Sequence, residues 1–381
     1  MILRQIQSLE TSVTLSESSA LAPPKLSDIC ATWLTRPEHV LTESARRAYV
    51  RSGLVAADHV ELPDYLRVCH SLGFYFAPNA PLEGANVLGM LMVWFFVVDD
   101  QVDDGIITDF DEAERFLDTI RDVFLQAKAD SEKAHVPAND TVAIGVEALS
   151  AAQKLSVELH AALRNLCHDR PSLYQRLLDD FLDWLDAVAP FIFQFRTHQS
   201  TTEAQACRMI NIGARLTMTA MEAVNGTRLS LRLVNHPYAE HLRQVAFRHV
   251  ILQNDLASYH RDARIPERRK NNLLSVLMAR HGLLLDDDVT QGLALATREL
   301  IAMEGEIRMH IELLRTACRT LPQHEVEAYA ALVQELVGGS WAWSLYGGRY
   351  HAQDNIIPEL RVTVDRGYNV TNSEWMKATT H

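Results

Sequence analysis

Apolar and polar residues follow one another along most of the chain with the three- and four-residue spacing of helices. The segments VEALSAAQKLSVELHAALRNL (146–166) and EHLRQVAFRHVILQNDLASYH (240–260) show this spacing most clearly, and it places the apolar side chains on one helix face. Alternating segments bounded by Asn-Gly or Asp-Gly, which predict β-hairpins, are lacking. We therefore predict an all-α fold with at least about ten helices.

Short polar stretches interrupt this pattern without dividing the chain into domains. They fall at 126–141, 196–203, 262–271 and 284–290. None of them is a long linker, and the composition does not change across them. We predict one helical domain over 26–360, preceded by a loosely held arm at 1–25 that ends in two prolines and followed by a tail at 361–381.

Composition and charge exclude several classes of protein. With 48% hydrophobic and 22% charged residues, the chain is typical of globular proteins. Its net charge of −13 argues against a nucleic-acid surface, which needs an excess of Lys and Arg, and suits a protein that binds cations. The chain contains no run of about eighteen apolar residues, which would predict a membrane span.

The cysteines and the N-terminus favour a cytoplasmic protein. None of the five cysteines belongs to a CxxC pair; they are Cys30, Cys69, Cys167, Cys207 and Cys318. Such scattered cysteines predict reduced thiols, with neither a disulfide framework nor a zinc site. The N-terminal MILRQIQSLETSVTLSESS lacks the apolar core and cleavage site of a signal peptide.

The segment WFFVVDDQVDD (94–104) passes directly from apolar residues into four carboxylates. On a helix, Asp99 and Asp103 lie about 6 Å apart along the axis and share a face. Asp100 and Asp104 form a second pair of the same spacing. Such carboxylates repel each other unless a cation neutralises them, and Mg²⁺ takes carboxylate oxygens while keeping positions open for substrate phosphates. Because the preceding LGMLMVWFFVV predicts a central helix, we favour a metal site over an exposed helix end.

A second polar face is predicted in NDLASYHRD (254–262). On a helix, Asn254, Ser258 and Asp262 follow at four-residue steps and form an oxygen-bearing ridge about 12 Å long. Asn and Ser are mildly unfavourable inside helices, because their side chains compete for backbone hydrogen bonds. A polar surface stripe would explain the ridge equally well if it stood alone. Facing the aspartates, it would complete an oxygen-only shell for several Mg²⁺ ions and a diphosphate.

With these two segments the sequence resembles class I terpene synthases of the microbial single-domain kind. Their aspartate-rich motif is DDxxD, and their second motif is NDxxSxxx(D/E) with a basic residue before the last acid. The matching residues here are Asp99, Asp100, Asp103, Asn254, Asp255, Ser258, Arg261 and Asp262. The last of these is Asp where the bacterial pattern usually has Glu.

A diphosphate-sensing arginine is also matched. Arg208 precedes Asn254 by 46 positions, as the corresponding arginine does in the family. After it, relatives often have Thr or Asp followed by Gly, whereas this chain has Asn211, Ile212 and Gly213. Ile212 takes the carbonyl-presenting effector position by spacing alone.

The C-terminal part carries the remaining matches. The segment WSLYGGRY supplies Trp343, Arg349 and Tyr350 for the family's Arg-Tyr pair with its upstream Trp. The segment KNNLLSVL (270–277) resembles the Asn-Leu-Val segment that follows the second motif in relatives. The resemblance spans residues 60–355, and its motifs occur in the family's order.

The resemblance implies a single-domain helical bundle around a central apolar cavity, closed at one end by metal ions. It implies three Mg²⁺ ions, or Mn²⁺ in their place, held by Asp99, Asp103, Asn254, Ser258 and Asp262. Asp100 or Asp104 would instead orient an arginine, although the two aspartate pairs share a spacing and the sequence leaves open which pair binds metal. The diphosphate would be gripped by Arg208, Arg261, Arg349 and the hydroxyl of Tyr350.

In such an enzyme the metals and arginines ionise an isoprenyl diphosphate to an allylic cation, and the cavity must then exclude water and offer aromatic faces. Phe96 and Trp343 are the first candidates for these faces, by proximity to the motifs. The others are Phe74, Tyr75, Phe95, Phe191, Phe193 and Phe195. Each ring could instead simply fill the core. His260 is expected as a hydrogen-bonded neighbour rather than a base.

The chain length favours farnesyl diphosphate as substrate and a sesquiterpene hydrocarbon or alcohol as product. A diterpene synthase using geranylgeranyl diphosphate is an alternative. A chain-elongating prenyltransferase would carry a second aspartate-rich motif in place of the Asn254 ridge, a class II cyclase would need a DxDD motif, and a helical scaffold would have no chemistry. The sequence leaves open the product, its stereochemistry, a bacterial or fungal origin and the oligomeric state, although relatives are often dimers.

Overall fold

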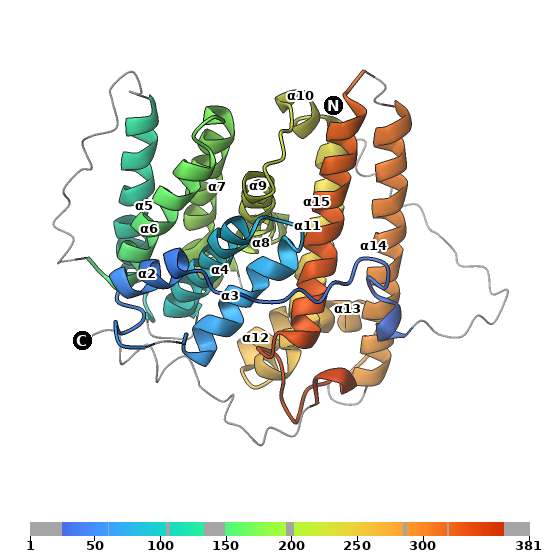
Figure 1. Cartoon of the computed structure of the whole chain (residues 1–381). Coiled ribbons are helices and arrows are strands. Elements are labelled where there is room, and N and C mark those ends of the chain that lie inside the picture. The colour runs from blue at the N-terminus through green and yellow to red at the C-terminus, as the bar shows by residue number, and fades with distance from the viewer. Residues whose placement is uncertain are drawn as a thin grey trace.

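The computed structural model describes residues 25–59, 61–103, 107–132, 149–195, 202–284, 288–317 and 320–361. Among these residues there is no β-strand, and helices make up most of the structure (Figure 1). The predicted all-α fold is therefore confirmed. The predicted N-terminal arm and C-terminal tail lie outside the described residues, apart from Lys25 and Arg361.

The helices follow one another along the chain in a bundle. The α-helices are α2 (Glu43–Arg51), α3 (Asp64–Phe76), α4 (Leu82–Asp103), α5 (Phe110–Glu132), α6 (Ala151–Leu166), α7 (Pro171–Pro190), α8 (Thr202–Asn211), α9 (Ala214–Val224), α10 (Leu231–Val234), α11 (Pro237–Asp262), α12 (Pro266–Asn271), α13 (Leu273–Arg280), α14 (Val289–Ala317) and α15 (Gln323–Tyr346). Short 3₁₀-helices occur at η1 (Leu26–Asp28) and η5 (Pro358–Leu360), and a π-helical turn, η3 (Phe191–Phe195), continues α7.

Helix α4 lies in the middle of the bundle and contacts α2, α3, α6, α7 and α9 (Figure 1). Its apolar run is buried on all sides, as the sequence predicts. Trp94 is fully buried, where its ring packs against Phe124, Phe181 and Trp184. Aromatic pairs prefer defined relative orientations and stabilise packing beyond the area that they bury. The carboxylates at the end of α4 are thus carried by a rigid element.

By length and composition alone, α4 could cross a membrane, since the stretch Leu82–Val102 has a mean hydropathy of 1.5. The sequence expectation concerned an unbroken run of about eighteen apolar residues, and this stretch contains none, because Glu83, Asn86 and Asp99 interrupt it. Inside the protein, however, 72% of the most apolar part is buried. A core helix has this character too, so α4 is only weak evidence for a membrane span.

Helices α3 and α4 approach each other closely through two glycines. A Cβ atom on Gly73 would lie 2.2 Å from the backbone nitrogen of Gly89, and one on Gly89 would lie 2.5 Å from the ring of His70. Only residues without a side chain allow this distance between the two backbones.

Helix α11 is the second element that positions the site. It begins at Pro237, after His236 accepts a hydrogen bond from the backbone N–H of Tyr238 at its N-terminus, and ends at Asp262. It lies against α14 and α15 (Figure 1), which bury most of its length. Its C-terminal turns therefore carry the ridge of Asn254 and Ser258 on a fixed backbone.

Element boundaries differ from the sequence prediction where local signals compete. The helix expected over 146–166 begins only at Ala151, because Ser150 and Gln153 form a reciprocal capping box there. Helix α5 continues to Glu132, into the polar stretch at 126–141, and the short helix α12 occupies most of the stretch at 262–271. Polar residues alone therefore did not prevent helix formation in these two stretches.

Candidate active site

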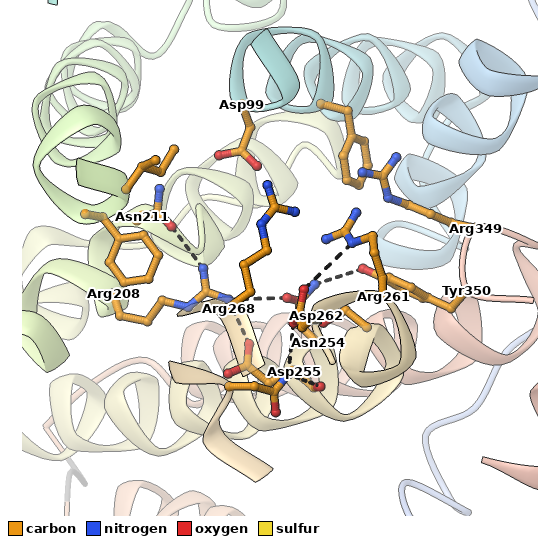
Figure 2. A pocket seen from close by; sticks show the side chains of 15 residues that line it. Asp99, Arg208, Asn211, Asn254, Asp255, Arg261, Asp262, Arg268, Arg349 and Tyr350 are labelled. Atoms are coloured by element: carbon orange, nitrogen blue, oxygen red, sulfur yellow. Dashed lines mark hydrogen bonds and ion pairs between the residues drawn. The ribbon is translucent and has the colours of Figure 1, made fainter. Parts of the chain in front are cut away.

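One pocket is shared by the two polar segments that the sequence singles out. Asp99 of α4 lies on one wall, and Asn254, Ser258 and Asp262 of α11 lie on another. Figure 2 shows Asp99 facing the α11 residues across the pocket. Arg208 completes the rim from α8. Segments far apart in the chain thus present their oxygen atoms and cationic groups to the same space.

Hydrogen bonds hold each of the three α11 residues in the pocket wall. The hydroxyl of Ser258 donates to Oδ2 of Asp262 at 2.9 Å. The amide of Asn254 donates through Nδ2 to the hydroxyl of Tyr350 at 2.9 Å, and its Oδ1 accepts from Nη2 of Arg208 at 3.3 Å. These contacts orient the amide, hydroxyl and carboxylate oxygens toward the same pocket.

Neighbouring aspartates on α4 face different partners. Asp99 lines the pocket. Asp100 is only 2% exposed, accepts hydrogen bonds from Nη2 of Arg349 at 3.2 and 3.5 Å, and accepts another from the hydroxyl of Tyr65. Asp103 ends α4, but its side chain and the whole of Asp104 lie outside the described residues. Of the two residues that can be compared, Asp99 faces the pocket and Asp100 binds an arginine.

Four arginines surround the pocket: Arg208, Arg261, Arg268 and Arg349. Arg208 donates through Nη1 to Asn211 at 2.9 Å and through Nη2 to Asp255 at 3.0 Å. Its Nε, the Nε of Arg349 and the Nδ2 of Asn211 are buried and have no hydrogen-bond partner among the described residues. Buried donors of this kind are rare unless a ligand accepts from them.

These contacts determine the charge states of Arg349 and Tyr350. Burial disfavours the charge on Arg349, yet the carboxylate of Asp100 raises the pKa of the guanidinium well above its ordinary value. Burial raises the pKa of the Tyr350 hydroxyl, even though Arg349 opposes this. At neutral pH the arginine is therefore charged and the tyrosine keeps its proton, so both can donate to an anion.

Asp255 belongs to the second motif, but the sequence analysis gave it no role of its own. It is 4% exposed, and its Oδ2 accepts from the backbone N–H of Leu273 at 2.8 Å. Burial raises the pKa of its carboxyl group, while Arg208 lowers it. Asp255 therefore joins α11 to both α8 and the start of α13.

The sequence analysis also missed the role of Asn272. Its Nδ2 donates to the backbone carbonyl of Asp255 at 2.6 Å and to Oδ2 of Asp262 at 2.9 Å. Asn272 and Ser258 thus both donate to Oδ2 of the Asp262 carboxylate and hold it in place. The quoted match at 270–277 contained Asn272, but spacing alone did not show which carboxylate it would contact.

Arg268 was missed for a different reason. It lies on α12, in a stretch that the sequence predicted only as a polar break, and its side chain lines the pocket (Figure 2). The only signal was the basic run in PERRKN, which is also typical of solvated surface loops.

The polar pocket described above, called the mouth from here on, opens into an apolar chamber. The two spaces share the lining residues Phe96, Asp99, Arg208, Asn211, Asn254 and Tyr350. Beyond them, the chamber is lined mainly by apolar side chains from α3, α4, α7, α9 and α15, including Leu72, Phe76, Met92, Phe95, Trp184, Leu336 and Trp343. A ligand with an anionic head and an apolar tail would fit both parts at once.

The predicted aromatic residues divide between this chamber and other places. Phe95, Phe96 and Trp343 line the chamber, and Phe191 lines the mouth. Trp343 stacks on Phe96 with 5.6 Å between ring centroids, and its Nε1 donates at 3.1 Å to the Val68 carbonyl.

Three further aromatic candidates do not line these two spaces where the structure describes them. The rings of Phe74 and Tyr75 pack near His39, because successive helix positions point in different directions and Phe76 instead faces the chamber. Phe193 packs against Phe110. The side chain of Phe195 lies outside the described residues.

The break between α8 and α9 also lies at the chamber. Gly213 has a φ of +72°, and a Cβ there would lie 2.8 Å from the ring of Phe95. This backbone conformation favours glycine. The break places Ile212 in the chamber wall and lets the Asn211 carbonyl accept from Nε1 of Trp184 at 2.8 Å.

His260 does not line either space. Its Nδ1 lies 3.0 Å from Nδ2 of Asn355, which also donates to the Tyr350 carbonyl at 2.8 Å. Burial lowers the pKa of His260, so the ring is neutral. It is a hydrogen-bonded neighbour of the site, as the sequence analysis expected.

The chemistry of the donor atoms allows a test of whether the site suits a metal. Asp99, Asn254, Ser258 and Asp262 offer only oxygen donors, without sulfur or imidazole, around one pocket. Such a set suits a hard divalent cation such as Mg²⁺ and disfavours the softer transition metals. The residues therefore fit the metal that the sequence predicts.

Comparisons with known proteins agree with this arrangement. A family model described as terpene synthase family 2, C-terminal metal binding, matches residues 90–292. Among curated relatives, the chain is 24% identical to terpene synthase 6 of Dictyostelium discoideum over 76% of each protein. It is 25% identical to terpene synthase 1 of Acytostelium subglobosum, over 76% of this chain and 83% of that protein.

Solved structures share the fold. Germacradien-4-ol synthase from Streptomyces citricolor has a TM-score of 0.60 at 14% identity, with 82% of this chain and 97% of that one covered. Linalool/nerolidol synthase from Streptomyces clavuligerus, in complex with 2-fluorogeranyl diphosphate, has a TM-score of 0.56 at 18% identity, with 81% and 96% covered. At these identities the likeness is one of fold.

Proposed function

The chain belongs to terpene synthase family 2, whose metal-binding model spans residues 90–292, and we propose that it ionises and cyclises farnesyl diphosphate with Mg²⁺. The expected products are a sesquiterpene hydrocarbon or alcohol and free diphosphate. The observation that carries this proposal is the continuity of the polar mouth with the apolar chamber, which share Asp99 and Asn254.

Terpene synthases act on isoprenyl diphosphates with the help of divalent metal, and the mouth supplies the groups for this step. We assign Asp99, Asn254, Ser258 and Asp262 as ligands for Mg²⁺, with three ions expected, and Asp103 as a further ligand by its spacing. When bound, the metal neutralises the charge that builds on the departing diphosphate. Asn272 and Ser258 hold the Asp262 carboxylate in place through their hydrogen bonds.

The arginines would bind the same anion from the protein side. Arg208 and Arg349 each have a buried Nε without a partner among the described residues, and a phosphate oxygen would satisfy such a donor. Arg261 and Arg268 lie on the rim of the same pocket. The hydroxyl of Tyr350 adds a neutral donor. These contacts strengthen as charge moves onto the diphosphate, so they lower the barrier to ionisation.

The chamber would hold the cation that ionisation leaves behind. Its aromatic faces stabilise positive charge without donating a lone pair, and its apolar lining excludes water from all but the mouth. Phe96 and Trp343 are proposed as the main faces, because both line the chamber and they stack on each other. Ile212 would present its backbone carbonyl to the reacting end of the substrate.

The substrate length remains part of the proposal. A 15-carbon substrate is our first choice, and geranylgeranyl diphosphate is the main alternative. The structural neighbour solved with 2-fluorogeranyl diphosphate supports an isoprenyl diphosphate in a chamber of this fold. We also propose that residues 26–360 form one domain, since one buried apolar cluster runs from Ile29 to Leu360. The free thiols of Cys30, Cys69 and Cys167 suit a cytoplasmic protein.

The experiment is a product analysis. Purified protein is incubated with Mg²⁺ and, separately, with geranyl, farnesyl or geranylgeranyl diphosphate, and volatile products and released diphosphate are measured. We expect turnover of farnesyl diphosphate to cyclic C15 products, which chelation of divalent metal abolishes. Turnover of geranylgeranyl diphosphate alone would make the protein a diterpene synthase, and longer prenyl diphosphates as products would overturn the cyclase assignment. Light scattering of the same sample tests for the homodimer that relatives often form.

A further inference from the structure

A second cluster of ligand-type side chains lies away from the active site. Cys30 follows η1, His249 belongs to α11 and Glu304 to α14, and these three residues are at most 2% exposed. The thiol sulfur, an imidazole nitrogen and a carboxylate oxygen all lie within 4.8 Å of one another. None of the three lines the mouth or the chamber.

The histidine in this cluster is poorly satisfied. Both of its ring nitrogens are buried and have no hydrogen-bond partner in the described part of the chain. Its Nε2 lies 3.6 Å from Oε1 of Glu304, which is too long for a hydrogen bond. Two ligand atoms that are each about 2.1 Å from a tetrahedral zinc ion lie roughly 3.4 Å apart. The spacing therefore suits a shared metal better than a direct contact.

The cysteine is held in an unusual conformation. Cys30 has a φ of +53°, the only positive φ at a non-glycine residue in the described part of the chain. Its backbone N–H donates to Oε1 of Glu304 at 2.7 Å, and Nε2 of Gln253 lies 3.4 Å from its sulfur. These contacts hold the sulfur beside the other two groups.

We propose that Cys30, His249 and Glu304 bind a zinc ion, with water as the fourth ligand. Sulfur, imidazole and carboxylate are the ligands that zinc takes in tetrahedral sites. On binding, the thiol releases its proton to solvent and a sulfur–zinc bond replaces the S–H bond.

The ion would fasten the N-terminal segment to the bundle. The segment from Cys30 to Trp33 packs against α14 and α15. Arg308 lies 4.7 Å from the Trp33 ring centroid, and a Cβ on Gly338 would lie 2.3 Å from the Trp33 carbonyl. A zinc ion at Cys30 would therefore join this segment to α11 and α14 at once. The site is separate from the oxygen-only mouth, so zinc here does not replace the catalytic metal.

The first test is a metal analysis of the full chain, expressed with zinc in the medium and dialysed against a chelator that removes weakly bound ions. We expect about one zinc per chain, lost in Cys30→Ala and Glu304→Gln. Cys167→Ala removes another buried thiol that lies outside the cluster and should keep the zinc. Wild-type protein without zinc, or zinc retained in Cys30→Ala, would overturn the proposal.

A second measurement covers the case in which Cys30→Ala does not fold. Wild-type protein stripped of zinc under reducing conditions is titrated with Co²⁺ in the absence of substrate. A sulfur-to-cobalt charge-transfer band together with the strong visible bands of four-coordinate Co²⁺ supports the site. Binding without the sulfur band, or no binding, contradicts it. Because neither readout depends on turnover, failure here is distinguishable from failure of the proposed cyclase activity.

Discussion

Asp100 and Arg349, 249 positions apart in the chain, form a buried ion pair with 3.2 Å between Oδ1 and Nη2. The guanidinium also lies over the ring of Phe96, with its carbon 4.2 Å from the ring centroid. This pair joins the carboxylate end of α4 to the segment after α15. Asp99, which lines the pocket, is the preceding residue on α4, so the ion pair lies directly beside it.

Removal of this pair should destabilise the protein strongly. Asp100→Ala leaves Arg349 buried without its carboxylate, and breaking a buried pair in this way typically costs about 3–5 kcal/mol. We expect a loss of that size in the free energy of unfolding, measured by denaturant titration. The control is Asp179→Ala, which removes an exposed ion pair with Lys128 and should cost at most about 1 kcal/mol. Equal losses in the two variants would show that the Asp100 pair contributes little.

Loss of the predicted metal ligands should abolish turnover and leave the fold intact. Asp99→Ala and Asn254→Ala each remove an oxygen donor from the mouth, and we expect turnover to fall at least about 100-fold, with an unchanged helical circular dichroism spectrum. Asp122 is an exposed acid on α5, so Asp122→Ala should retain the wild-type rate. Normal rates in both mouth variants would remove the metal assignment.

The amide of Asn272 should matter for metal affinity although it is not itself proposed as a ligand. Asn272→Ala removes the 2.9 Å hydrogen bond that orients the Asp262 carboxylate. Loss of such an outer partner typically weakens metal binding by about 10–100-fold. We expect a shift of that size in the Mg²⁺ concentration for half-maximal turnover, with a smaller effect at saturating Mg²⁺. An unshifted Mg²⁺ curve would assign Asn272 to packing alone. Asn79→Ala, which removes an exposed amide bound to Glu335, is the matched control.

Some of the features behind these predictions could be predicted from the sequence, and others could not. The apolar run that ends at Asp99 and the ridge from Asn254 to Asp262 are local patterns, and each could be read directly. The presence of Arg208 at the same site as Asn254 was expected from the family resemblance. The hydrogen bond between Asn272 and Asp262 was not, because it depends on how the short helix α12 turns the chain back.

The residues that line the chamber were also only partly predictable from the sequence. The sequence analysis named Phe74 and Tyr75 as candidates, but it could not show which ring of α3 faces inward, and two helical steps of about 100° each separate Phe74 from Phe76. Trp184 was not considered because it lies far from every motif. The cluster of Cys30, His249 and Glu304 joins three distant segments, so no spacing rule could reveal it.

Arg268 is predicted to bind the diphosphate from α12. One charge-assisted hydrogen bond contributes about 1.5–3 kcal/mol, so Arg268→Ala should raise the KM for the isoprenyl diphosphate and weaken inhibition by inorganic diphosphate by roughly 10-fold or more. Arg264→Ala provides the control, because Arg264 lies nearby but pairs with the exposed Asp354 outside the mouth. If both variants behave alike, the effect arises from general charge and not from a contact in the pocket.

Trp343 should control the product more than the rate of ionisation. Trp343→Phe keeps an aromatic ring but leaves more room and removes the hydrogen bonds from Nε1 to the Val68 carbonyl and the Ser71 hydroxyl. Because ionisation depends on the mouth, we expect diphosphate release within about tenfold of wild type, together with a larger share of early-quenched alcohols and incompletely cyclised products. Gas chromatography of the products, compared with total diphosphate released, measures both effects.

Trp341 offers a matched comparison for this change. It lies two residues away on α15, is fully buried and does not line the chamber. Trp341→Phe should lower stability, as large-to-small changes in the core do, and leave the product pattern unchanged. A shift in products with Trp341→Phe as large as that with Trp343→Phe would mean that general loosening of α15, and not the face presented by Trp343, determines where the cation is quenched.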